Sequence, residues 1–505
     1  MADVSRFAPP GPALSLRLTL YVIAISMTWG CTVGPDFERP VPPADDRYTH
    51  EPAISATVVA GGESQRFIPG AAPPENWWQL FGSPELDDTV QTAFSHNPTA
   101  DAAQASLRES QDNLRAGYGV FFPQVGVAGQ AMRELAPPAN GQLQQAGVFN
   151  LTTASASVTY LFDFFGGKRR SVEALRAQVD YQRYLAIATY LTLSTNVVNT
   201  TIAYAAYRAE LDATQHVISL QMQQLDAIRA QVSAGTASFS SILSIQSLIA
   251  SNQATVSQLD QKLAQSSHLL ATLQGRPPAQ AAPPTVTLEA LTLPADLPVT
   301  LPSQLVRQRP DVLAAEARLH VASANIGVAT AAMFPSISLS GTYGKQANAF
   351  AQLPADGFRF WGIGPSVSIP IFEGGSLRYA RQAAIDAFEV AQASYRQTVL
   401  TAFAQVADAL SSLEQDAKTL QAEEAAMQDA REALDLVQVN LRAGTAGYLD
   451  VLVADVQYQQ SSIAYLDAVA RRPSPVARRQ QDTVALLAAL GGGWRALPGI
   501  DGDGK

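Results

Sequence analysis

The feature that most constrains the fold is an internal repeat, which is best sought before any other assignment. The stretch NPTADAA at 97–103 recurs as RPDVLAA at 309–315, and Phe122-Pro123 recurs as Phe334-Pro335. Further along, FGG at 165–167 is echoed by EGG at 373–375, and SAGTA at 233–237 by RAGTA at 442–446. Four landmarks repeated in one order indicate that one structural unit has been duplicated.

The first copy predicts a helix, two strands and two more helices. Residues 124–130 and 153–161 alternate between apolar and polar side chains, which is typical of strands with one apolar face. Residues 135–150 contain Pro, Asn and Gly and predict a loop between them. From Lys168 to Val232 there is neither Gly nor Pro, so we expect a helix of about 100 Å. Gly235 ends it, and a second helix is expected over 239–273.

The second copy repeats this order. Alternation within 336–343 and 366–371 predicts two strands, separated by a loop at 347–358. Residues 376–442 again lack Gly and Pro and predict a long helix, followed by a turn at Gly444 and Gly447 and a returning helix. Pro473 and Pro475 predict a break in that last helix, because proline removes a backbone donor and clashes with the preceding turn.

Strands of this length suit a transmembrane β-barrel, which uses about 9–11 residues per strand. The alternative is a soluble hairpin packed on helices. Four strands cannot close a barrel, and lipid does not tolerate open edges, so a barrel would be shared by two or three chains. Both ends of each hairpin lead to long helices on one side of the membrane, and a ring of these helices would form a tunnel. A plain coiled-coil stalk is the alternative interpretation of the helices.

The N-terminus has the features of an export signal. Arg6 and Arg17 precede a short apolar run at 18–27, which is too short to span a bilayer and resembles a secretory signal peptide. Cys31, the chain's one cysteine, stands where cleavage is expected and resembles the lipidated cysteine of a bacterial lipoprotein. The alternative is ordinary cleavage with a free thiol. A lone cysteine excludes an internal disulfide.

Composition and charge argue against several function classes. The formal net charge is −10, and no basic stripe is present, so we expect no nucleic-acid partner. The short run Lys168-Arg169-Arg170 is interpreted as a solvated helix end. The five histidines are scattered and match no catalytic or metal-binding motif, so we expect no enzyme activity, cofactor or metal site.

Several motifs resemble those of a known family, the outer-membrane factors of tripartite efflux systems (TolC- and OprM-like), and most closely its NodT-type lipoproteins. The resemblance covers nearly the whole mature chain. The matching stretches are GCTVGPDF at 30–37, WWQLF at 77–81, LPSQLVRQRPD at 301–311, FP at 334–335, PIFEGG at 370–375, RAG at 442–444 and LGGGW at 490–494.

The resemblance implies a mainly α-helical fold with a transmembrane β part. Three chains would form a homotrimer with a twelve-stranded β-barrel in outer-membrane lipid, continued by a long periplasmic α-helical barrel. The duct would be passive and would join a periplasmic adaptor and an inner-membrane transporter of the resistance-nodulation-division (RND) type. The expected segments are a signal peptide at 1–30, an extended segment at 31–76, repeats at 77–300 and 301–494, and a tail at 495–505. The expected hairpins lie at about 124–162 and 336–371.

The resemblance also assigns roles to the helix-hairpin tips, at about 233–238 and 442–450. Asp450 occupies the position of the family's periplasmic gate aspartate. At the position where some relatives have a second gate aspartate, this chain has Val453. Asp455 lies nearby but on another helical face. The alternative for Asp450 is a carboxylate that favours a helix start. The tip turns are expected to dock the adaptor; they comprise Ala234, Gly235, Thr236, Ala443, Gly444 and Thr445. Two alternative functions remain: a TolC-like duct for type I protein secretion, and a periplasmic structural coiled coil.

Overall fold

The computed structural model describes residues 32–50, 55–60, 63–136, 147–354, 359–467 and 475–493 of the 505-residue chain. The expected signal peptide, Cys31, Trp494 and the C-terminal tail lie outside these residues. In chain order the helices and strands are β1 (Arg66–Pro69), α2 (Pro84–His96), α3 (Pro98–Gly117), β2 (Gln124–Ala136), β3 (Gly147–Phe162), α4 (Gly167–Ser233), α5 (Phe239–Leu273), β4 (Asp296–Val299), α6 (Pro302–Leu305), α7 (Pro310–Ala331), β5 (Ser336–Ala347), β6 (Arg359–Ser368), α8 (Ser376–Arg442), α9 (Tyr448–Asp467) and α10 (Pro475–Ala489).

The chain divides into two compact units, and each unit contains segments from both sequence repeats. The first unit comprises the chain up to Arg39 together with Glu109–Asp180 and Glu316–Ser394. The second comprises Pro40–Arg108, Tyr181–Ala315 and the chain from Tyr395 onward. The duplicated sequence therefore does not fold as two separate domains placed one after the other.

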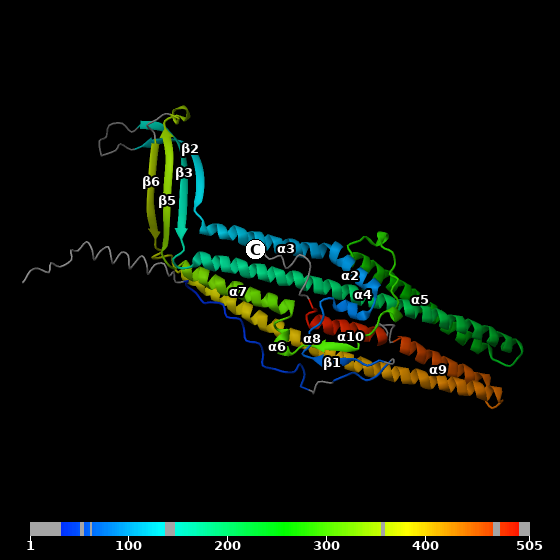
Figure 1. Ribbon diagram of the computed structural model, residues 1–505. Coiled ribbons are helices and arrows are strands. Elements are labelled where there is room, and N and C mark those ends of the chain that lie inside the picture. Colours follow the sequence, from blue (N-terminus) through cyan, green and yellow to red (C-terminus); the bar gives the residue numbers. More distant parts are fainter. Residues whose placement is uncertain are drawn as a thin grey trace, which may run out of the picture. The chain divides into compact units, whose positions relative to one another are not determined.

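The first unit contains an antiparallel four-stranded sheet in the order β2-β3-β5-β6 (Figure 1). Each predicted hairpin is present, and the two hairpins pair with each other through β3 and β5. The expectation of a strand over 366–371 is wrong at its end, because β6 stops at Ser368. Pro370 follows two residues later, and its ring nitrogen has no hydrogen to give to a ladder.

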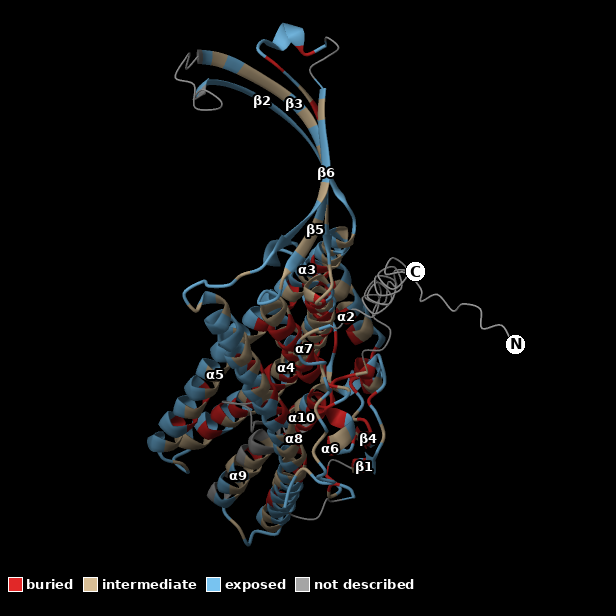
Figure 2. Cartoon of the chain, turned by 90° about the vertical axis from the view of Figure 1, so that its left-hand side faces the viewer, coloured by how far each residue is buried: buried red, intermediate tan, exposed pale blue. Residues whose placement is uncertain are grey.

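The register of the sheet separates apolar from polar side chains. Val125 lies opposite Val158, and Tyr343 lies opposite Trp361, all on one face. The other face carries mainly small or polar residues, such as Gly126 opposite Ser157, with apolar exceptions such as Met132 opposite Leu151. Most of the sheet is exposed or half-buried in the single chain (Figure 2).

The second unit has a helical core. Buried side chains of α8, α10, β4 and the start of α7 form one apolar cluster, which includes Leu297, Val312, Val406, Leu413 and Leu486. The short strands β1 and β4 pair in parallel beside it, with Phe67 opposite Leu297. A smaller cluster joins α4 to α5 near the turn between them, through Ile228, Ile245 and neighbouring side chains.

The two longest helices agree with the sequence prediction. α4 and α8 each contain 67 residues, which corresponds to about 100 Å at the usual rise of 1.5 Å per residue. The predicted break around Pro473 lies outside the described residues, between α9 (Tyr448–Asp467) and α10 (Pro475–Ala489). Within the described residues, no helix is both long and apolar enough to cross a membrane.

Candidate functional site

The turn between α4 and α5 is built on Gly235. This residue ends α4 in the left-handed region, with φ of 79°, where a side chain is disfavoured. Its N–H donates to the Val232 carbonyl at 3.1 Å, and the Thr236 N–H donates to the Gln231 carbonyl at 2.9 Å. These two bonds define a Schellman cap, which satisfies carbonyls that the helix end leaves free.

The turn between α8 and α9 has the same construction. Gly444 has φ of 74°, and its N–H donates to the Leu441 carbonyl at 3.0 Å. The Thr445 N–H donates to the Asn440 carbonyl at 2.9 Å. In both turns the threonine hydroxyl donates to the same carbonyl as its own N–H, at 3.0 Å in the first and 3.1 Å in the second. The repeated Ala-Gly-Thr sequence therefore encodes one local structure twice.

The residues of these two turns are accessible in the single chain. All six predicted docking residues are exposed: Ala234, Gly235, Thr236, Ala443, Gly444 and Thr445. A rigid backbone with exposed small side chains can accept a close-packed partner without first becoming ordered.

Asp450 lies in the first turn of α9 and is exposed. Its Oδ2 atom accepts the Gly447 N–H at 2.8 Å, and its own N–H donates to the Gly447 carbonyl at 3.1 Å. This is one half of a capping box, in which an acidic side chain reaches back to the N-terminal donor of its helix. The carboxylate therefore stabilises the start of α9, as one of the two sequence interpretations expected.

A second aspartate of α9 links it to another helix. Asp455 is half-buried and accepts hydrogen bonds from Gln224 of α4 and Gln459 of α9. Burial raises the pKa of Asp455, although the bond from Gln459 opposes the shift. The sequence places Asp455 close to Asp450 but does not reveal Gln224, since no motif marks a glutamine in the middle of a long helix.

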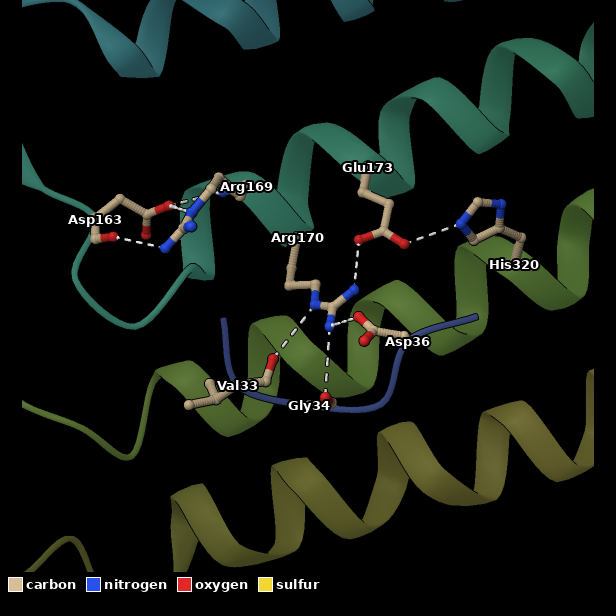
Figure 3. A network of polar contacts seen from close by, with 8 residues as sticks. All are labelled: Val33, Gly34, Asp36, Asp163, Arg169, Arg170, Glu173 and His320. Atoms are coloured by element: carbon tan, nitrogen blue, oxygen red, sulfur yellow. Dashed lines mark hydrogen bonds and ion pairs between the residues drawn. The ribbon is translucent and has the colours of Figure 1, made fainter. Parts of the chain in front are cut away.

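The segment that follows Cys31 is fixed by a network of polar contacts around Arg170 (Figure 3). Arg170 Nε donates to the Val33 carbonyl at 3.3 Å, and Nη2 donates to the Gly34 carbonyl at 3.4 Å. The same guanidinium contacts Asp36 Oδ1 at 2.6 Å and Glu173 Oε2 at 2.7 Å. The expectation of a solvated charge run is wrong for Arg170, whose side chain is 4% exposed because the N-terminal segment covers it.

Further contacts continue this attachment along α7. The Phe37 ring stacks on His320 with centroids 4.3 Å apart, and His320 Nε2 lies 2.9 Å from Glu173 Oε1. Gly34 has φ of 94°, and a Cβ there would collide with the backbone of Gly327. This close approach of two backbones requires glycine on the N-terminal segment.

Arg309 of the Arg-Pro-Asp motif has a structural role in the second unit. Its guanidinium contacts both carboxylate oxygens of Asp311, at 2.9 and 2.6 Å, and donates to Gln405 at 2.7 Å and to the Ala489 carbonyl at 2.8 Å. It therefore joins α7, α8 and the end of α10. Among the described residues, no group of three or more His, Cys, Asp or Glu side chains could hold a metal ion.

The comparisons with known proteins agree with this geometry. A family model described as outer membrane efflux protein matches residues 89–276 and 301–492. The pyoverdine export outer membrane protein OpmQ of Pseudomonas putida is 31% identical over 451 residues, covering 88% of this chain and 94% of the relative. The toluene efflux pump outer membrane protein TtgC of Pseudomonas putida is 28% identical over 484 residues, covering 95% of each.

Nodulation protein T of Rhizobium leguminosarum bv. viciae is 28% identical over 498 residues, covering 95% of this chain and 94% of the relative. Among solved structures, the outer-membrane channel OprN has a TM-score of 0.80 and 25% identity, covering 92% of this chain and all of that one. The resemblance seen in the sequence is confirmed: the chain belongs to the outer membrane efflux protein family.

Proposed function

We propose that this passive outer-membrane efflux channel works as a homotrimer, in which three four-stranded sheets close one twelve-stranded barrel. The observation that carries the proposal is the two-faced sheet. Over most of the sheet, its register gathers apolar side chains on one face and small or polar ones on the other, as expected for lipid outside and water inside. β2 and β6 are its edges, and lipid requires every edge to be paired.

The trimer would be anchored through a lipid on Cys31. The residues that follow Cys31 support lipidation of that cysteine, because Arg170 and His320 hold residues 33–37 against α4 and α7. A segment fixed in this way would transmit the anchoring to the folded protein and would not act as a loose tether. Two or more acyl chains are enough for stable attachment to a membrane.

The Ala-Gly-Thr turns at Gly235 and Gly444 would dock a periplasmic adaptor, which in turn joins an inner-membrane RND transporter. The exposure of both turns and their shared backbone geometry support this role. The relative TtgC is named as the outer membrane protein of a toluene efflux pump. Small molecules of the periplasm are accordingly the proposed substrates.

The gate would be formed at the same tips. Three copies of Asp450 around an axis would repel one another and attract cations. The link between Gln224 and Asp455 would hold the two helical hairpins of one chain together in the closed state. Opening would then require breaking this link, since α9 cannot move away from α4 while the bond remains.

The test is native mass spectrometry of the protein extracted from outer membranes in mild detergent, combined with single-particle imaging. A trimer with a membrane band at one end supports the proposal, whereas a monomer or another ring size would overturn it. Affinity purification from cross-linked cells then identifies the partners. Recovery of an adaptor with an RND transporter is expected, and recovery of a type I secretion transporter instead would favour the protein-secretion duct.

A further inference from the structure

A hollow of about 860 Å³ lies where the sheet of the first unit ends and α4 begins. It is formed by the ends of β3, β6 and α7 together with the segment after β6. Its apolar lining includes Phe162, Phe165, Phe334, Ile369, Ile371 and Phe372. The volume falls within the range of about 300–1,000 Å³ that is common for pockets holding small apolar molecules.

The lining leaves apolar surface uncovered in the single chain. Ile371 is 92% exposed and Phe372 is 89% exposed, although both side chains are large and apolar. The Phe165 and Phe334 rings stack with centroids 4.7 Å apart and form a wall. Clustered exposed apolar side chains of this kind mark a surface that is covered by another apolar group.

Three charged residues line the hollow: Asp163, Lys168 and Glu373. The two beside the start of α4 are already engaged. Lys168 Nζ donates to the carbonyls of Val120 and Leu161 at 2.7 Å each. The Asp163 carboxylate accepts the backbone N–H groups of Lys168 and Arg169 at 3.0 Å each. Glu373 is exposed, so its carboxylate is left in solvent. The rest of the hollow therefore favours an uncharged alkyl chain over a polar headgroup.

The N-terminal segment runs directly to this hollow. The Val33 N–H donates to the Phe165 carbonyl at 3.1 Å. Thr32 packs so closely over Gly166 that a Cβ there would lie 2.7 Å from its methyl group. The residues on either side of Gly166 line the hollow. Because a trans peptide spaces successive Cα atoms by about 3.8 Å, a group attached to Cys31 starts within reach of it.

We propose that one acyl chain carried by Cys31 lies in this hollow. The occupant would be a fatty acyl group of the chain's own anchor, which places the lipid against the base of the sheet and covers Ile371 and Phe372. The inference rests on the lipid anchor of the proposed function and adds a specific binding site for it. Arg170 acts here as a positioning residue, because it fixes the segment from which the acyl chain extends.

The test uses cells fed a fatty acid that carries a photoreactive diazirine. After irradiation, the purified protein is digested with trypsin and its cross-linked peptides are sequenced. We expect the peptide that carries Cys31 to be joined to peptide 134–168 or to peptide 360–378, which contain the lining residues. The requirement for the Cys31 peptide in the product distinguishes the chain's own anchor from membrane phospholipid.

A matched pair of variants sharpens the result. Phe372→Asp places a charge in the hollow and is expected to reduce the cross-link yield several-fold. Phe350→Asp is the control, since Phe350 is 79% exposed and lies after β5, away from the lining. Intact mass must show the acyl additions in both variants.

The outcomes separate the two proposals. An intact mass without acyl groups removes the lipid anchor and the site together. A lipidated protein whose Cys31 peptide is joined only to phospholipid, to a neighbouring subunit at other residues, or to no protein peptide overturns the site and leaves the anchor standing.

Discussion

Arg170 Nη2 lies 2.6 Å from Asp36 Oδ1, and this contact joins the first turn of α4 to the segment that follows Cys31. The two partners differ in environment: the Arg170 side chain is buried, whereas the Asp36 side chain is 91% exposed. An exposed carboxylate contributes little to an ion pair. Most of the stabilisation must therefore come from the bonds of Arg170 to Glu173 and to the backbone carbonyls of Val33 and Gly34.

This difference predicts unequal mutational effects. Arg170→Ala should lower the free energy of unfolding by about 3 kcal/mol, because it takes the buried guanidinium away from Glu173 and from the Val33 and Gly34 carbonyls and leaves Glu173 with His320 alone. Asp36→Asn should cost less than about 1 kcal/mol. Thermal unfolding in detergent measures both, and chymotrypsin cleavage after Phe37, whose ring is stacked on His320 while the segment is attached, reports the release of the segment. Equal losses in the two variants would contradict the assignment.

Acid should release the same segment. Burial alone would raise the pKa of Glu173, but hydrogen bonds from Arg170 and His320 outweigh it and lower that pKa below its ordinary value of 4.5. A depressed carboxyl pKa adds stability that is present above the unfolded value and is lost as the pH falls through the folded one. Chymotrypsin cleaves poorly in acid, so pepsin digestion in steps below pH 4.5 is the measurement.

In Glu173→Gln the acid-dependent step should disappear, and the segment should be cleaved at similar rates across this range. A wild-type protein whose segment is equally protected at every pH would show that Glu173 does not control the attachment.

In the second unit, the pKa of Asp482 is shifted in the opposite direction to that of Glu173. Burial, reinforced by the nearby Asp416, raises the pKa of Asp482 to about 7. Between about pH 4 and pH 7 the folded protein keeps a proton on Asp482, whereas the unfolded chain, with the ordinary aspartate pKa of 3.8, has already lost it. The free energy of unfolding therefore falls as the pH rises from about 4 to 7.

Asp482→Asn should remove this slope and stabilise the protein at pH 8. The upper bound is about 4 kcal/mol, at 1.36 kcal/mol for each pKa unit. Unfolding midpoints at pH 5 and pH 8 measure the effect. A variant that keeps the wild-type pH slope would exclude Asp482 as its source.

Local sequence signals predicted the helices well because their causes are local. The absence of Gly and Pro between Ser376 and Arg442 predicted α8 with the bounds that the structure has, and Gly235 and Gly444 marked turns that need a positive φ. The networks around Arg170 and Asp455 could not be predicted in this way. Their partners lie far apart in the sequence, so only the packing of helices brings them together.

The glycines of the two tips predict a further measurable effect. Gly235→Ala and Gly444→Ala should each cost about 1–2 kcal/mol, the strain of a side chain in the left-handed region. Gly447→Ala is the control, because Gly447 has no positive φ and a Cβ there meets Asp450 at an ordinary 3.4 Å.

If the proposed docking site is right, binding of a periplasmic adaptor to the detergent-solubilised protein should weaken in the first two variants and stay unchanged in the control. Unchanged binding in all three would show that the adaptor docks elsewhere.

The two aspartates of α9 should affect the channel in different ways. Asp455→Ala removes the hydrogen bond from Gln224 of α4, so the proposed gate should loosen and the single-channel conductance should rise. Asp450→Ala removes a carboxylate that caps α9 and faces solvent, so it should mainly reduce the preference for cations. Asp429→Ala, an exposed residue within α8, is the control for a lost charge. Planar-bilayer recordings give conductance and ion selectivity separately.

A double variant tests whether the bond between Asp455 and Gln224 is the restraint. If Asp455→Ala and Gln224→Ala each raise the conductance and the double variant adds nothing further, the bond between them is the restraint. Additive effects would mean that each residue restrains the tip through other contacts.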